Sequence, residues 1–264
     1  MKSVIQTEQL PSRRILSRMG LIKGQKGILN RYFRESEGWK KHLEETRQFI
    51  LHSAENKETG VTAILGSGWL LDVPLEELSE RFVEVHLYDL HHPPQIRKKA
   101  EAYPNVKLIQ TDLTGGTIRQ AYEAVKKFRK GGEKILLNAL ANQPFRFVHP
   151  PDFIVSVNTL NQLNILITDY MRKKKAYTNK ELLQLDGKIQ QNHLDTMIPG
   201  KSCIITDFEE ELYDQEGEWI GTNPLVYVNL PEGNFRRQWQ WKFDTQMRYR
   251  EEAQTFLNVT AVDL

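Results

Sequence analysis

The stretch VTAILGSGWLLDVPL, residues 61–75, contains the feature that decides the fold. The apolar run 61–65 stops abruptly at Gly66-Ser67-Gly68, after which the chain turns apolar again. An apolar run of this length before a glycine turn is typical of a buried strand that ends in a loop. Glycines there let a ligand approach backbone N–H groups that a Cβ would obstruct, although an ordinary tight turn fits the same residues.

Strand-like and helix-like segments alternate along the rest of the chain. We expect strands at 61–65, 83–89, 105–110, 152–158 and 201–207, separated by helices at 72–82, 93–103, 117–130, 159–175 and 179–198. Two more strands, 237–243 and 255–262, follow each other without a helix and predict an antiparallel pair. Short apolar strands alternating with helices form a mostly parallel sheet covered on both faces. The sequence therefore predicts a doubly wound α/β domain with a seven-stranded sheet.

Three other stretches carry weaker signals. The stretch KILLNALANQPFRF, residues 134–147, fits either an extra strand or an apolar loop. The acidic run DFEEELYDQEGE, residues 207–218, is most simply a solvated helix. Trp239 and Trp241 fall on one face of a strand and are expected in the core rather than in a substrate pocket.

Residues 1–58 precede the first predicted strand and are expected to form a helical N-terminal segment. A helix over 38–56 has an apolar face, so this segment must pack against the rest of the chain. We expect it to act as a lid or a substrate-binding element over a Rossmann-like domain at 59–264. The leader is also basic; it could contact an anionic substrate or RNA, and a solvated basic face explains the same charges.

The composition is that of an ordinary globular protein. The net charge of +2 is too small to indicate a nucleic-acid partner by itself. No apolar run approaches the roughly 20 residues that cross a bilayer, and the N-terminus lacks a secretory signal, so we expect a cytoplasmic protein with no membrane partner. The single cysteine, Cys203, excludes an internal disulfide and is expected to be a buried structural thiol. No spacing of His, Asp or Glu predicts a metal site.

Acidic residues follow two of the predicted parallel strands. In open parallel sheets, ligands bind beyond the carboxyl ends of the strands, where the strand order reverses. Asp89, about 20 residues after the glycine turn, is placed to accept hydrogen bonds from two ribose hydroxyls. Asp112 could accept from an exocyclic amine, with Leu113 against a purine face. Each residue alone could be a helix cap or a turn, but in this order they predict a nucleoside-containing ligand.

The segments ILGSGWLLDVPL, HLYDL, QTDLT and FIVSVNTLNQL resemble the successive motifs of class I S-adenosylmethionine-dependent methyltransferases. The resemblance covers residues 58–264 and includes the closing strand pair. It implies methyl transfer with S-adenosylmethionine as the cofactor. The residues that it places around the cofactor are Gly66, Ser67 and Gly68 with Trp69 near the methionine part, Asp89 and Leu90 at the ribose, Asp112 and Leu113 at the adenine, and Asn158 beside the sulfonium.

Two positions depart from the pattern of that family. An acidic residue usually stands two places before the first glycine, where this chain has Ile64, and a third glycine often stands at the position of Leu70. Our hypothesis is that Asp72 supplies the missing acid from the other side of the turn. No DPPY- or NPPY-like tetrapeptide follows the fourth strand, which argues against methylation of a flipped base amine.

Methyl transfer requires little acid–base chemistry, because the sulfonium is already activated. Asn161 and Gln162, just past the fourth strand, could orient an acceptor through paired donor and acceptor groups. His193, on the helix before the fifth strand, is a candidate base. Asn161 and Gln162 could equally be helix-capping or surface polar residues. His193 could simply hydrogen-bond to a backbone carbonyl. We expect a small-molecule acceptor, since the basic leader supports RNA only weakly.

A second interpretation rests on Tyr170 and Lys174, which have YxxxK spacing. This spacing resembles short-chain NAD(P)-dependent oxidoreductases, in which the tyrosine is the proton donor. The serine that this family places upstream falls at Val157 here, with Ser156 next to it, and the glycine turn lacks the TGxxxGxG pattern. A non-catalytic nucleoside-binding protein is a third interpretation.

Overall fold

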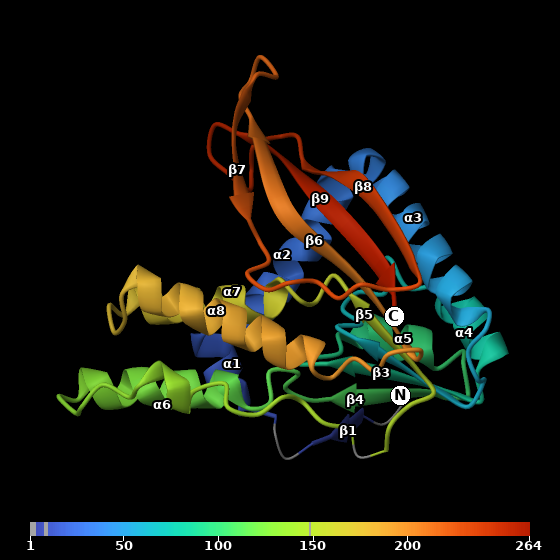
Figure 1. Ribbon diagram of the computed structural model, residues 1–264, viewed down its shortest axis with the longest axis horizontal. Coiled ribbons are helices and arrows are strands. Elements are labelled where there is room, and N and C mark those ends of the chain that lie inside the picture. The colour runs from blue at the N-terminus through green and yellow to red at the C-terminus, as the bar shows by residue number, and fades with distance from the viewer. Residues whose placement is uncertain (1–3, 8–9, 148) are drawn as a thin grey trace.

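The computed structural model describes residues 4–7, 10–147 and 149–264, which fold around one large sheet (Figure 1). The strands are β1 (Val4–Gln6), β2 (Val61–Leu65), β3 (Glu84–Asp89), β4 (Val106–Gln110), β5 (Phe153–Val157), β6 (Ser202–Tyr213), β7 (Trp219–Pro224), β8 (Phe235–Asp244) and β9 (Gln254–Asp263). The helices are α1 (Arg13–Arg18), α2 (Leu21–Arg34), α3 (Ser36–Ala54), α4 (Leu75–Arg81), α5 (Pro94–Ala100), α6 (Thr117–Arg129), α7 (Gln162–Lys173) and α8 (Asn179–Leu194).

The sheet is mostly parallel, as predicted. Its strand order is β1-β4-β3-β2-β5-β6-β9-β8, and β7 pairs with β6 off this path. The strands from β1 to β6 in this order run parallel to their neighbours, whereas β9 is antiparallel to both β6 and β8. The chain winds from β2 to β3 and β4 on one side and returns to β5 on the other. The strand order therefore reverses beside β2, directly at the glycine turn.

The prediction of seven strands is wrong, because the sheet has nine. One extra strand is β1, which extends the edge of the sheet by pairing with β4 in a leader expected to be helical. The other is β7, because the acidic run 207–218 is not a solvated helix but the end of β6 and a turn into β7. The physical reason is that neighbouring segments satisfy the acidic side chains: buried Glu210 accepts hydrogen bonds from Arg250 of the loop before β9 and from Asn223 of β7.

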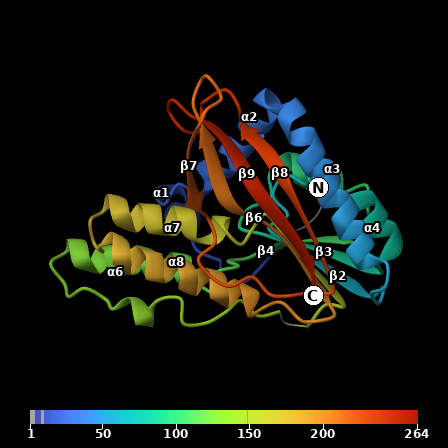
Figure 2. The same ribbon diagram turned by 45° about the horizontal axis from the view of Figure 1, so that its top comes forward.

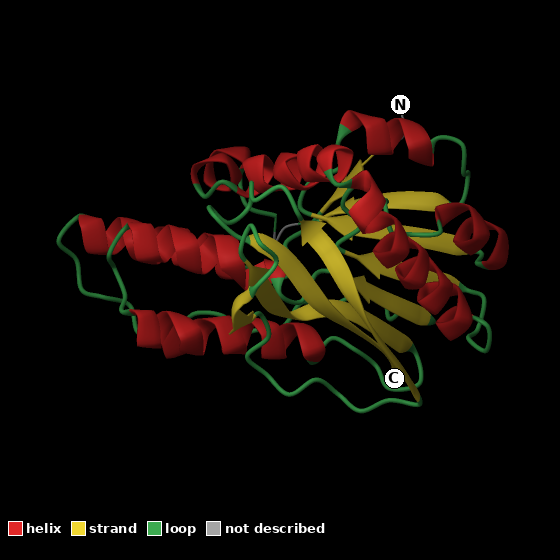
Figure 3. Ribbon diagram, turned by 90° about the horizontal axis from the view of Figure 1, so that it is seen from above, coloured by secondary structure: helices red, strands yellow, loops and turns green. Residues whose placement is uncertain are grey.

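Helices cover both faces of the sheet, with α3, α4 and α5 on one side and α6, α7 and α8 on the other (Figures 1 and 3). The pleat of β2 shows why. Ile64 packs in a core shared with side chains of α3, α4 and α5, whereas Ala63 and Leu65 pack in a core that includes Leu160 and Met197. Successive side chains of a strand point to opposite faces, so a continuous apolar run needs two covering layers.

The leader bridges these two layers. Ile22 of α2 packs with the side chains of α6 and α7, whereas Ile28 and Tyr32 pack in the core on the α3 side. Helix α3 then runs along β8 (Figure 2). Because β8 joins the sheet through β9, helix α3 and the last strands of the chain lie together at one end of the sheet.

The apolar stretch 134–147 forms a loop with a short 3₁₀ turn at Leu137–Ala139 and adds no strand to the sheet. Side chains replace the hydrogen bonds that a strand would have made. The N–H of Ala141 donates to Gln120, and its carbonyl accepts from Asn192. Cys203 is fully buried in β6, as expected of a structural thiol. Among the residues described, no helix combines the length and apolar character that spanning a membrane requires.

Candidate functional site

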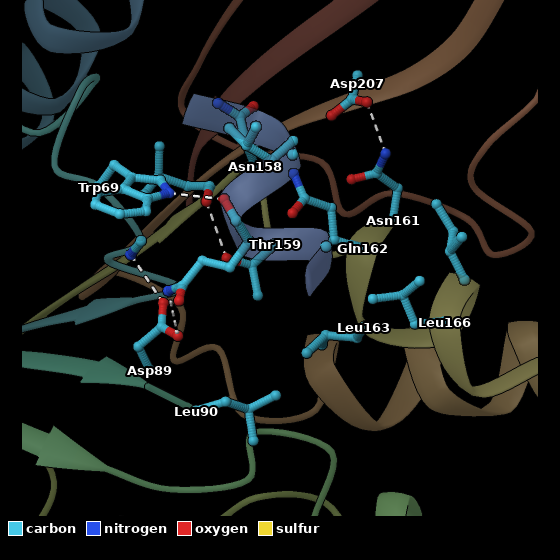
Figure 4. A pocket seen from close by; sticks show the side chains of 18 of the residues that line it. Trp69, Asp89, Leu90, Asn158, Thr159, Asn161, Gln162, Leu163, Leu166 and Asp207 are labelled. Carbon is cyan, nitrogen blue, oxygen red and sulfur yellow. Dashed lines mark hydrogen bonds between the residues drawn. The ribbon is translucent and has the colours of Figure 1, made fainter. Parts of the chain in front are cut away.

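A cavity of about 460 Å³ lies at the carboxyl ends of the parallel strands (Figure 4). Its walls come from the loops after β2, β3, β4 and β5, from α2, α3 and α7, and from β6 and β8. This volume is within the range of small-molecule sites, about 300–1,000 Å³. The sequence-predicted residues that line it are Gly66, Ser67, Gly68, Trp69, Asp89, Leu90, Asp112, Leu113, Asn158, Asn161 and Gln162. His193 is not among the lining residues.

The two glycines of the turn differ in their surroundings: Gly66 is packed against Thr159, whereas Gly68 has open space beside it. Gly66 has a φ of +74°, and a Cβ there would lie 1.8 Å from Oγ1 of Thr159. Gly68 has a φ of +49°, and the nearest atom to an added Cβ is a backbone oxygen at 3.6 Å. Leu70 also has a positive φ, +52°, a conformation that favours glycine. The chain thus keeps the backbone conformation of the missing third glycine with a leucine in its place.

Asp89, at the end of β3, ties the glycine turn to the leader. Its Oδ2 accepts a hydrogen bond from the backbone N–H of Gly68 at 2.8 Å, and its Oδ1 accepts from Nε2 of Gln25 at 3.3 Å. The carbonyl of Gln25 accepts from the indole N–H of Trp69 at 2.7 Å. Gln25, on α2, was not singled out from the sequence, because nothing local marks it as the residue that reaches Asp89.

Asp112 is fully buried just past β4. Its Oδ1 accepts hydrogen bonds from the backbone N–H and the hydroxyl of Thr114, at 2.9 and 2.6 Å. Its Oδ2 has no hydrogen-bond partner among the described residues. Burial raises the pKa of Asp112 to about 6. A buried carboxylate with one free oxygen at the cavity wall is suited to accept a hydrogen bond from a ligand.

The opposite end of the cavity contains a second buried acid, Asp207 of β6. Its Oδ2 accepts a hydrogen bond from Nδ2 of Asn161 at 2.6 Å (Figure 4). Asn161 Oδ1 and Asp207 Oδ1 are both buried without a partner among the described residues. Burial, with the nearby charge of Glu210, raises the pKa of Asp207 to about 6. Gln162 borders the cavity but is exposed.

Asn158 follows β5 with a φ of +47°, which is uncommon for a residue other than glycine. Its Nδ2 lies 2.8 Å from Oδ2 of Asp72 and 3.1 Å from Nε2 of His42. Nδ1 of His42 accepts from the indole N–H of Trp239 at 3.1 Å. Burial lowers the pKa of His42 to about 3, so its ring is neutral at pH 7. Asp72, the proposed substitute acid, thus borders the cavity and contacts Asn158.

Aromatic side chains from α3 and β8 form the remaining wall. Trp39 stacks with Phe243 at 5.7 Å between ring centroids, and Trp241 stacks on His42 at 3.7 Å. The guanidinium of Arg31 lies 4.4 Å from the centroid of Phe243. Trp241 was expected in the core, and it is buried there while also lining the cavity. These residues come from the two ends of the chain, so local sequence gave no signal that they share a site.

Three other sequence candidates lie elsewhere. His193 Nε2 is 2.7 Å from Oγ of Ser156, and burial lowers the pKa of this histidine to about 4. Tyr170 and Lys174 line a separate surface cavity, whose cationic lining residues also include Arg14, Arg18, Lys126, Arg129 and Lys130. Neither residue lies in the cavity of the glycine turn. Within the part of the chain that the structure describes, no cluster of three or more His, Cys, Asp or Glu side chains could hold a metal ion.

No protein-family model and no curated protein matches the chain. Among solved structures, the chain resembles DhpI in its DhpI-SAM-HEP complex, with 9% identity, a TM-score of 0.42 and coverage of 95% of this chain and 99% of that one. It also resembles a SAM-dependent methyltransferase from Aquifex aeolicus, with 13% identity, a TM-score of 0.34 and coverage of 81% and 88%. A precorrin 8w decarboxylase from Methanobacterium thermoautotrophicum gives 13% identity, a TM-score of 0.34 and coverage of 83% and 90%.

S-adenosylmethionine-dependent methyltransferases are therefore among the structures that this chain resembles. At such low identities and TM-scores the resemblance carries no weight for the activity or the substrate of this protein. Both have to be inferred from the cavity itself.

Proposed function

We propose that the protein transfers a methyl group from S-adenosylmethionine to a small molecule. The observation that carries this proposal is the convergence of Gly68, Asp89 and Asp112 on one cavity. They come from three successive strand ends, and the resemblance of the sequence motifs implies the same three positions for this cofactor. Their convergence at the point where the strand order reverses also agrees with the general location of ligand sites in open parallel sheets.

The groups of this wall match the parts of an adenosyl ligand. The open space beside Gly68 suits the methionine end, because no Cβ fills it, although the N–H of Gly68 already donates to Asp89. Asp89 can accept from ribose hydroxyls where it now accepts from Gln25. The unpartnered Oδ2 of Asp112 can accept from the adenine amine, with Leu113 against the ring. When bound, S-adenosylmethionine supplies a methyl group that is already activated for transfer.

The acceptor end of the cavity is small and has polar groups. Asn161 and Asp207 leave buried oxygens without partners there among the described residues, so an acceptor that reaches them can be held in line with the methyl group. A carboxylate with a pKa of about 6 is ionised at pH 7 and can take a proton from the acceptor. Because the same 460 Å³ must hold both ligands, a small molecule is favoured over nucleic acid.

The leader, residues 1–58, acts as the lid of this site in our proposal. Gln25 of α2 bonds to both Asp89 and the carbonyl of His91, so α2 closes directly over the proposed ribose position. Hydrogen exchange with and without S-adenosylhomocysteine tests this role. We expect slower exchange in 21–34 when the ligand binds, and unchanged exchange throughout 1–58 would contradict the lid.

Isothermal titration of the protein with S-adenosylmethionine and, separately, with NADPH tests the proposed function. We expect saturable binding of S-adenosylmethionine alone. Binding of NADPH alone would favour the oxidoreductase interpretation. Binding of S-adenosylmethionine without transfer of its labelled methyl group to any of a panel of small acceptors would favour a nucleoside-binding protein.

A further inference from the structure

A buried row of hydrogen bonds runs from the C-terminal strands to the cavity. It connects Trp239 of β8, His42 of α3, Asn158 after β5 and Asp72 after β2. The three separations are 3.1 Å from Trp239 Nε1 to His42 Nδ1, 3.1 Å from His42 Nε2 to the Asn158 amide, and 2.8 Å from that amide to Asp72 Oδ2. Trp239, His42 and Asn158 are each at most 9% exposed, so their bonds are shielded from water, whereas Asp72 is half-buried at the cavity wall.

The donors and acceptors of this row can be assigned from one fixed end. An indole N–H can only donate, so His42 Nδ1 must accept. A neutral imidazole has one N–H, so His42 must then carry its proton on Nε2 and donate to Asn158. An Asn amide that accepts this bond must present its oxygen to His42. A rotation of the Asn158 side-chain amide by 180° exchanges its oxygen and nitrogen and leaves the other heavy atoms in place. That oxygen then faces Asp72 Oδ2 at 2.8 Å, a contact that requires Asp72 to be the donor.

We propose that the indole N–H of Trp239 sets the direction of every bond in this row, so that Asp72 carries a proton and Asn158 turns its NH₂ toward the cavity. With Asp72 ionised, one pair of groups in the row would face donor to donor or acceptor to acceptor. Such a buried mismatch is costly, which makes the protonated arrangement the stable one.

The surroundings of Asp72 agree with this assignment. Burial raises the pKa of Asp72, and three smaller influences lower it: a hydrogen bond from the Asn158 amide, a hydrogen bond from the backbone of Asp72, and the charge of Arg47 on α3. Turning the Asn158 amide removes the first of these. The guanidinium of Arg47 donates to the carbonyl of Leu71, and its charge, which favours an ionised Asp72, is the smallest of these opposing influences. His42 stays neutral because burial lowers its pKa, and it therefore adds no positive charge that would favour an ionised Asp72.

The consequence for recognition rests on the proposed function. The Asn158 atom that points away from His42 and Asp72 is buried without a partner and borders the cavity. If that atom is nitrogen, the wall offers a hydrogen-bond donor beside the proposed methyl position. The site would then select an acceptor molecule that brings an oxygen there, such as a carboxylate, phosphonate or hydroxyl group, over one that brings only N–H donors.

Carbon-13 NMR of the Asp72 side-chain carboxyl, titrated between pH 4 and pH 9, tests the proton directly. We expect the protonated chemical shift to persist at pH 7. In Trp239→Phe, which keeps a ring and loses the N–H, His42 is free to change its tautomer, and the Asp72 midpoint should fall by one pH unit or more. An ionised Asp72 at pH 7 in the unmodified protein would overturn the proposal.

Trp241→Phe is the matched control. Trp241 lies on the same strand and stacks on His42, but its indole N–H has no partner among the described residues. Its replacement should leave the pH midpoint of the Asp72 titration unchanged. Equal changes of this midpoint in the two variants would contradict a role for the Trp239 N–H. Nitrogen-15 NMR of His42 in the unmodified protein gives an answer even if a variant does not fold: we expect the Nε2–H tautomer, and the Nδ1–H tautomer refutes the row.

These spectra do not depend on any ligand. Failure to bind S-adenosylmethionine with a protonated Asp72 would contradict the proposed function alone. Binding with an ionised Asp72 would contradict only the inference about the row.

Discussion

The two walls of the cavity are built in different ways. The wall at the strand ends comes from the loops after β2, β3 and β4, where backbone N–H groups and carboxylates lie within a few residues of a strand. The facing wall comes from α2, α3 and β8 and is mainly apolar and aromatic. The first wall follows from the order of the sequence, whereas the second exists only once the two ends of the chain have packed together.

The largest effect on stability is expected from adding a side chain at Gly66, in the wall at the strand ends. Gly66→Ala would place a Cβ 1.8 Å from Thr159 Oγ1 at a φ of +74°, so it should lower the free energy of unfolding by about 3 kcal/mol. Gly68→Ala has open space and should cost only about 1 kcal/mol, for the backbone strain alone. Urea unfolding measures both values. Thr159→Ala should recover part of the loss in Gly66→Ala, and equal costs for the two glycines would mean that the turn is not divided as described.

Removing the acid that joins the two walls should have the next largest effect. Asp89→Ala deletes the acceptor proposed for two ribose hydroxyls and should weaken S-adenosylmethionine binding by about 1.5–3 kcal/mol, or about 10- to 150-fold. Isothermal titration gives the affinity, and urea unfolding corrects for the lost bond to Gly68. Asp195→Ala is the control, since this residue lies at the end of α8 outside the cavity lining and its carboxylate accepts only from the side-chain amide of Gln191 among the hydrogen bonds of the described residues. Unchanged affinity in Asp89→Ala would remove this residue from the site.

This division of the walls explains what could be predicted from the sequence. Asp89 and Asp112 were found because the strands before them have a clear apolar pattern, and parallel strands bring their carboxyl ends to one edge. Gln25 and His42 were missed because their partners lie in distant segments. His42 follows Trp39 by three residues on the buried face of α3, and a histidine on such a face was the one available signal.

The same reasoning accounts for the errors in the fold. Strand β1 is only a short edge strand, and its pairing with β4 depends on contacts that local propensity does not encode. The acidic run 207–218 looked solvated because its partners lie outside the run, Asn223 on the next strand and Arg250 and Asn258 much farther along the chain. Composition alone therefore suggested a solvated helix where the chain forms the hairpin of β6 and β7.

A pH dependence should sharpen the assignment of the adenine end. The pKa of Asp112 is raised to about 6, so its carboxyl is ionised above pH 6 and protonated below it. A ligand amine needs the ionised acceptor, so the affinity for S-adenosylhomocysteine should be highest above pH 7 and fall as the pH drops through 6, by up to about tenfold per pH unit. Asp112→Asn cannot titrate and should flatten the profile between pH 5 and pH 7. A profile that is unchanged in this variant would assign the dependence to another group, with Asp207 the first to test.

The smallest effect is expected at the separate surface cavity. Tyr170→Phe and Lys174→Ala change residues outside the wall of the glycine turn, so each should alter the affinity for S-adenosylmethionine by less than about twofold. The stacked rings of Tyr122 and Tyr170 remain in the Phe variant, which keeps the packing of α6 against α7. Isothermal titration of both variants beside Asp89→Ala therefore compares the two cavities in one experiment. A loss in Tyr170→Phe as large as that in Asp89→Ala would mean that the ligand reaches α7, and the strand-end wall could not then be the whole of its site.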